Sequence, residues 1–200
     1  MSLWGNAHAA ATNKPKFLPE DESSDYNRAD CYATEAGWVM QAGHPSSGNS
    51  NTAAAPEVLV ASGGLAGATN TTGLRAPTVT SMRFVIGTAA ATDFTAGSSS
   101  QTIACEITWD EGVTVAGSPR VVVVNDSRSN HTLTYTATGS TANRKRFTVA
   151  SQTIVAGDVL TLGGNNITLN SGTISDTVRG GTNLAASLVL SGLTAVTHTV

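Results

Sequence analysis

Apolar and polar side chains alternate along the middle of the chain. Ile103, Cys105, Ile107 and Trp109 stand at every second position, which is the side-chain period of a β-strand with one buried face. Threonine is frequent on the opposite face, and the same alternation returns over residues 132–138. The pattern predicts a sheet with one dry face and one face in water.

Short apolar segments separated by turn-forming residues continue toward the end of the chain. Gly, Asn, Asp and Ser interrupt them at fairly regular spacing, and no amphipathic helical segment connects them. The expected strands are residues 82–86, 100–109, 120–124, 131–138, 146–149, 159–162, 167–169 and 185–190. Such a series without helices predicts an all-β fold, a β-sandwich over residues 77–200.

Two segments of different character precede this domain. Residues 1–43 are polar and are interrupted by Pro15 and Pro19, each of which biases the residue before it away from helix. We therefore expect an extended N-terminal arm. Residues 44–76 are rich in Gly, Ser, Ala, Asn and Thr, which is the composition of a linker. Within this linker, residues 58–60 have the character of a short strand.

The arm carries many of the large apolar side chains of the molecule. Because it is too polar to form a core of its own, these side chains favour docking on a partner. The alternative is that they pack on the β-domain of the same molecule. The candidate partner-binding residues are Trp4, Phe17, Leu18, Tyr26, Tyr32, Trp38, Val39 and Met40.

The low content of charged residues favours some classes of protein over others. Charged residues make up 12% of the chain, the formal net charge is −3 and the sequence pI is about 5.7. So few charges are more typical of an extracellular or virion β-protein than of a cytosolic enzyme, and nothing indicates nucleic-acid binding. The first residues do not resemble a signal peptide, and no segment approaches the roughly 18 apolar residues of a membrane span. We expect synthesis in a cytoplasm and no membrane partner.

Residue types that carry catalysis or bind metals do not gather into a pattern. Cys105 alternates with apolar residues, so a buried thiol is expected rather than a disulfide with Cys31. Acidic residues lie at turns, where they usually accept backbone hydrogen bonds rather than bind calcium. No glycine-rich loop precedes a helix. We therefore expect no enzyme, no cofactor and no metal, with solvated histidines at His8, His44, His131 and His198.

A compact basic cluster, Arg144-Lys145-Arg146, is expected at the tip of a hairpin. The simpler interpretation is a solvated run of charges. The alternative is contact with an acidic partner, such as residues 20–22 in the arm of a neighbouring molecule.

Part of the chain resembles a known type of domain. The segments Val113-Thr-Val-Ala-Gly-Ser-Pro119, Ile154-Val-Ala-Gly-Asp158 and Leu169-Asn-Ser-Gly-Thr-Ile-Ser-Asp176 resemble an immunoglobulin-like β-sandwich repeat of large bacterial and phage surface proteins. The resemblance covers about residues 80–190, and the chain departs from it after Asp176. It implies an immunoglobulin-like fold for the β-domain.

The arm has a second resemblance. Met1-Ser-Leu-Trp-Gly-Asn6, Pro15-Lys-Phe-Leu-Pro-Glu-Asp21 and Ala33-Thr-Glu-Ala-Gly-Trp-Val-Met-Gln-Ala-Gly43 are similar to the N-termini of small virion structural proteins of tailed phages, especially myoviruses of marine cyanobacteria. This resemblance implies a capsid decoration or cement protein on the phage head. Its implied partners are the major capsid protein and further copies of itself, with a trimer as one arrangement.

Two other functions stay open. In the first, the β-domain binds glycans of a host surface, and the residues that come nearest to such a site are Trp109-Asp110 and Asn165-Asn166. In the second, the chain is a head–tail connector or tail subunit, which differs from a decoration protein only in its position on the particle.

Overall fold

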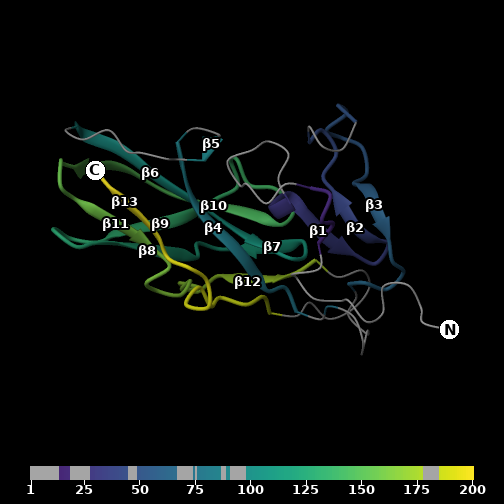
Figure 1. Ribbon diagram of the computed structural model, residues 1–200. Helices are drawn as coiled ribbons and strands as arrows, with labels where there is room; N and C mark the ends of the chain where they lie inside the picture. Colours follow the sequence, from purple (N-terminus) through teal and green to yellow (C-terminus); the bar gives the residue numbers. More distant parts are fainter. Residues whose placement is uncertain are drawn as a thin grey trace.

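The structure is a computed structural model that describes residues 14–18, 28–44, 49–66, 74, 76–86, 89–90, 98–177 and 185–200. The chain is nearly all β (Figure 1). This confirms the expected class. Among the described residues, no helix is long and apolar enough to cross a membrane.

One large sheet forms the body of the molecule. Its strands are β4 (Val79–Ile86), β5 (Ala89–Ala90), β6 (Ser98–Trp109), β8 (Arg120–Asn125), β9 (His131–Thr136), β10 (Arg144–Ile154), β11 (Val159–Leu162) and β13 (Val196–Thr199). They lie in the order β13-β11-β8-β9-β10-β6-β4-β5, and the neighbouring strands are antiparallel. A separate two-stranded sheet pairs β7 (Val113–Ala116) with β12 (Thr173–Asp176).

The large sheet curls until it is nearly closed and barrel-like (Figure 1). The outer strand β13 returns toward β4, where the His198 ring meets the Phe84 ring edge-on with 5.2 Å between centroids. Such curling shields sheet edges and encloses one face of the strands.

The enclosed face is the dry face that the alternation predicts. Ile103, Cys105, Ile107 and Trp109 are all fully buried, and they pack with residues of the other strands in one continuous core. The Trp109 indole Nε1 donates a hydrogen bond of 3.0 Å to the Ser187 carbonyl oxygen. The polar edge of this ring is thus satisfied inside the core.

The opposite face of β6 is exposed at Thr102 but buried toward the end of the strand, contrary to expectation. Glu106 and Thr108 are buried there. Arginine side chains of the neighbouring strands and the N-terminal residues cover this face. Alternation along one strand shows which side chains share a face, but not whether a distant segment covers that face.

The N-terminal residues form a sheet of their own. A short 3₁₀ helix, η2 (Arg28–Asp30), leads into β1 (Cys31–Thr34) and β2 (Gly37–Met40), and β2 pairs with β3 (Glu57–Ala61). Gly37 follows the turn with φ of 131°, and a Cβ there would collide with the Val60 carbonyl oxygen. Glycine therefore permits this close approach of β2 and β3.

The expected extended arm over residues 1–43 is not confirmed. In its described part, β1 and β2 form a hairpin, and the expected linker supplies β3 together with buried Leu65, Ala66 and Leu74. A second apolar core forms between these segments. The polar composition of the arm hid this core, because its apolar partners come from residues 59–74.

The immunoglobulin-like arrangement is not confirmed either. Within residues 77–200, four strands were not expected, namely β5, β7, β12 and β13. Two expected strands, residues 167–169 and 185–190, contain only isolated bridges, between Arg120 and Thr168 and between Ser175 and Ala185.

Candidate partner-binding site

The structure separates the predicted partner-binding residues into three groups. Phe17 is 68% exposed. Trp4 and Tyr26 lie outside the described residues. The others are buried within the chain itself: Leu18, Tyr32, Trp38, Val39 and Met40. In this structure the N-terminal sheet and its core already cover these side chains, so their contact with a partner stays a prediction that would require this sheet to open.

Phe17 lies on a turn that Arg28 holds in place. The Leu18 backbone N–H donates to the Pro15 carbonyl oxygen at 3.3 Å, which closes the turn. The Arg28 guanidinium donates to three carbonyl oxygens of the same turn, one of which is the Pro15 oxygen. These bonds are Nε to Pro15 at 3.2 Å, Nη2 to Lys16 at 3.1 Å and Nη2 to Leu18 at 3.0 Å. A planar guanidinium with several donors suits such a task.

The turn is anchored on both sides of its exposed tip. Lys14, Pro15 and Leu18 are buried, whereas Lys16 and Phe17 are exposed. A large aromatic side chain is thus held in water on a backbone that is already ordered. Such a residue loses little further freedom on binding, and burying it contributes about 2 kcal/mol.

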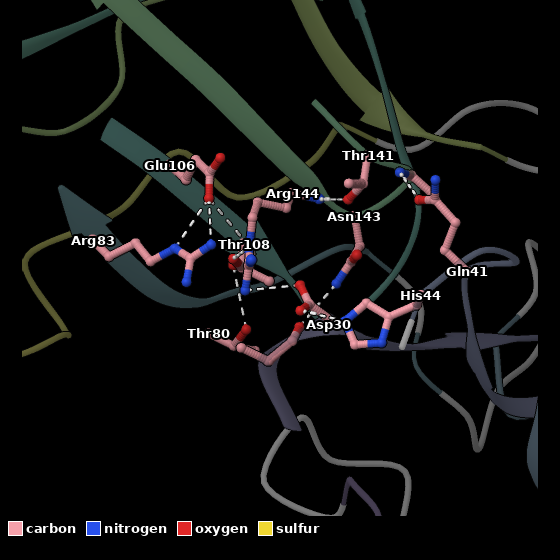
Figure 2. A network of polar contacts seen from close by, with 12 residues as sticks. Asp30, Gln41, His44, Thr80, Arg83, Glu106, Thr108, Thr141, Asn143 and Arg144 are labelled. Atoms are coloured by element: carbon pink, nitrogen blue, oxygen red, sulfur yellow. Dashed lines mark hydrogen bonds and ion pairs between the residues drawn. The ribbon is translucent and has the colours of Figure 1, made fainter. Parts of the chain in front are cut away.

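A network of buried charges joins the N-terminal sheet to the large sheet (Figure 2). At its centre, Glu106 Oε2 accepts from Arg83 Nη2 at 2.8 Å, and Glu106 Oε1 accepts from Arg146 Nη2 at 2.6 Å. Arg144 Nε lies 3.7 Å from Glu106 Oε2 and donates to Thr108 Oγ1 at 3.2 Å. Three arginines on β4 and β10 therefore surround one carboxylate of β6.

Arg144 also reaches across to the N-terminal sheet. Its Nη2 lies 2.8 Å from Asp30 Oδ1, while His44 Nε2 lies 2.9 Å from Asp30 Oδ2. Burial by itself would raise the pKa of Asp30, but the hydrogen bond from His44 and the positive charge of Arg144 outweigh it and lower that pKa. Figure 2 shows Arg144 between Glu106 and Asp30.

Hydrogen bonds between uncharged groups also connect the N-terminal sheet to the large sheet. The Ala33 N–H donates to the Asp110 carbonyl oxygen at 2.7 Å. Asn143 Nδ2 donates to the Ala29 carbonyl oxygen at 3.2 Å, and Gln41 Oε1 accepts from the Ala142 N–H at 3.3 Å. Since these bonds link β1 and β2 to the large sheet, the N-terminal sheet is fixed on the body of the molecule.

Two expectations about charged and titratable residues are therefore wrong. Arg144 and Lys145 are buried rather than solvated, and the acidic partners of Arg144 come from its own chain. His131 is buried and its Nδ1 lies 2.7 Å from Gln152 Oε1, while His44 is paired with Asp30. Sequence reasoning also missed Arg28 and Asp30, since nothing local marks their distant partners.

The histidine, cysteine and acidic side chains of the described residues can be compared with the requirements of a metal site and of a reactive thiol. No group of three or more His, Cys, Asp or Glu among them is placed to hold a metal ion. Both cysteines are free and buried. Burial raises the pKa of Cys31 to about 12 and raises that of Cys105 as well, so both thiols stay protonated at neutral pH.

Of the two residue pairs considered for glycan binding, the fold buries the one that contains Trp109 and exposes the other. Trp109 is fully buried, so its ring cannot stack on a sugar. Asn165 and Asn166 are exposed, and Asn166 Oδ1 accepts from the Leu190 N–H at 3.0 Å.

Comparison with known proteins gives no relative: no protein-family model, no curated protein and no solved structure matches this chain.

Proposed function

We propose that this chain is a structural virion protein, a decoration or cement protein that binds the outer surface of a phage head and reinforces contacts between major capsid subunits. The observation that carries the proposal is the anchored turn that presents Phe17. If the Phe17 ring inserts into a pocket of the partner protein, this residue acts as a binding hot spot. The sequence resemblance of residues 15–21 to phage virion proteins supports the same turn.

In this proposal the N-terminal sheet is a rigid mount rather than an extended tether. Its own large side chains fill its core, and the charge network holds it on the large sheet. Each bound copy stabilises contacts that the shell already makes. Because many copies bind to a regular lattice, a modest binding energy per copy gives a large total stabilisation of the shell.

Self-association belongs to the proposal as well. Among the described strands, β3 pairs on one side only, with β2, and Val58 on it is exposed. An open edge of this kind is best covered by a symmetry mate, as in a trimer.

Localisation on an intact particle tests the proposal. Purified particles are imaged by electron cryomicroscopy with and without this protein. The proposal expects added density at repeated positions on the head surface. Density confined to the neck, the tail or a fibre would contradict it and would favour a connector or adsorption protein.

A glycan-binding module is the alternative function. The exposed Asn165-Asn166 loop is the described feature that favours it. A specific signal on a glycan array that disappears in Asn165→Ala, with no binding to capsids, would select this alternative.

A further inference from the structure

Three buried polar side chains where the N-terminal residues meet the end of β6 have incomplete hydrogen bonding. Lys14 is 4% exposed, and its Nζ donates to the Ala29 carbonyl oxygen at 3.1 Å. No carboxylate oxygen of the described residues lies within 4.0 Å of that nitrogen. Asp110 and Glu111 are 1% and 2% exposed, and Asp110 Oδ2 and Glu111 Oε1 have no hydrogen-bond partner in the described structure. Each such orphaned buried group costs about 1–3 kcal/mol.

A chain of hydrogen bonds connects Lys14 to the backbone that precedes Asp110. The Ala29 oxygen that accepts from Lys14 also accepts from Asn143 Nδ2 at 3.2 Å, and Asn143 Nδ2 donates to the Trp109 carbonyl oxygen at 3.0 Å. Trp109 immediately precedes Asp110. A path of three hydrogen bonds therefore joins the Lys14 amine to the Trp109–Asp110 peptide.

A backbone hydrogen bond holds the Asp110 carboxyl group in position. Asp110 Oδ1 accepts from the Thr78 N–H at 2.6 Å, which leaves Oδ2 as its orphaned oxygen. To reach Asp110, the Lys14 side chain has to change its rotamer and give up its hydrogen bond to Ala29, which is worth about 1 kcal/mol.

Burial also shifts the pKa values of Lys14, Asp110 and Glu111 toward neutral pH. It lowers the pKa of Lys14 to about 8, although the nearby carboxylates of Asp110 and Asp30 act to raise it. It raises the pKa of Asp110 to about 6 and that of Glu111 to about 8. A neutral amine and protonated carboxyl groups are therefore accessible near neutral pH, in a site that excludes water.

We propose that Lys14 and Asp110 react with each other to form an isopeptide bond inside the protein, with Glu111 relaying protons. The neutral Nζ attacks Cγ of the protonated Asp110 carboxyl, and a C–N bond forms. Glu111 accepts a proton from the nitrogen and delivers one to the hydroxyl oxygen on Cγ. The C–O bond then breaks and one water molecule leaves, so that the reaction needs no oxidant or other reactant.

The bond would fasten the Phe17 turn to the end of β6 by a covalent link. It would also close a loop from Lys14 to Asp110, and this restricts the unfolded chain as a disulfide does. This inference does not depend on what Phe17 contacts, and its test contains no capsid.

Intact-mass spectrometry of the full, denatured chain tests the proposal. Wild-type protein is expected to be lighter than its calculated mass by one water molecule, and peptide sequencing is expected to join Lys14 to Asp110. Lys14→Arg keeps a cation and is expected to have its full calculated mass. Lys16→Arg, the matched exposed control, is expected to show the same loss of water as the wild type.

The proton relay by Glu111 is tested separately, by the rate at which the bond forms. Glu111→Gln keeps both reacting groups, and we expect it to form the bond at least about tenfold more slowly after refolding. Wild-type protein at its full calculated mass would overturn the proposal. So would a loss of water that persists in Lys14→Arg, or a loss of ammonia, which would place the bond on an amide such as Asn143.

Discussion

Two adjacent apolar side chains in the N-terminal region differ in their burial. Phe17 and Leu18 are neighbours in the sequence, yet Leu18 fills the core of the N-terminal sheet while Phe17 points into water. The difference arises because Arg28 closes the backbone of the turn around them. One residue therefore stabilises the fold, and the other is available for recognition.

Glu111 makes the stability of the protein depend on pH. Burial, and then the charges of Asp110 and Asp176, raise its pKa from 4.5 to about 8. The folded state therefore binds more protons than the unfolded state between these values, and stability falls as pH rises through this window. We expect the free energy of unfolding to fall by about 2 kcal/mol from pH 5.5 to 7.5.

Urea unfolding at several pH values measures this effect. Glu111→Gln removes the titrating group, so its free energy of unfolding is expected to vary much less over the same range. An equally steep pH dependence in Glu111→Gln would contradict the role assigned to Glu111.

Glu106 compensates the charges of Arg83, Arg144 and Arg146. Glu106→Gln would leave these arginines with less negative charge in a buried site, and breaking a buried ion pair costs about 3 kcal/mol. We expect a loss of that size in chemical unfolding followed by tryptophan fluorescence. Glu57→Gln, an exposed carboxylate on β3, is the control and is expected to change stability by less than about 0.5 kcal/mol. Equal losses in the two variants would show that the network adds no stability.

The long strands of the large sheet could be predicted from the sequence, whereas the N-terminal hairpin could not. β6 has an alternating pattern over many residues, and the expected bounds of β8 and β11 lie close to those observed. β1 and β2 have only four residues each, so too few alternations exist to identify them. Their third strand and apolar partners come from a segment with the composition of a linker.

Among the described candidate residues, Phe17 is the one that the structure leaves exposed, and the charge network could not be predicted from the sequence. The partners of Arg144, namely Glu106 and Asp30, lie far from it in the sequence. A run of three basic residues has the same local pattern whether it is solvated or paired across two sheets. Its burial depends on tertiary contacts, which no local pattern records.

Asp30 links the two main sheets, so its loss should loosen one sheet and spare the other. In Asp30→Asn the ion pair with Arg144 is removed. We expect hydrogen exchange in β1 and β2 to accelerate by about tenfold or more, which corresponds to at least about 1.4 kcal/mol, while β8 and β9 keep their protection.

The matched control for this experiment is Asp126→Asn. Asp126 is an exposed aspartate after β8, and its replacement is expected to leave exchange in both sheets unchanged. Uniform acceleration across all strands in Asp30→Asn would show that the N-terminal sheet does not open separately.

The whole molecule combines a curled sheet of low charge with a small sheet fixed on it by buried ion pairs. This arrangement places one exposed aromatic ring on a rigid support. For a protein that acts in many copies on a lattice, rigidity reduces the entropy lost on each binding event. In the proposed function the described part of the N-terminal region therefore acts through its folded shape.

Binding of this protein to purified phage heads that lack it is the most direct test of this account. Wild type, Phe17→Ala and Lys16→Ala are compared by co-sedimentation over a range of concentrations. Because Phe17 is exposed, its removal should leave folding intact, and a lost hot spot of about 2 kcal/mol weakens binding by at least tenfold. We predict that loss for Phe17→Ala and near-normal binding for Lys16→Ala; saturation of the heads by Phe17→Ala with unchanged affinity would contradict the account.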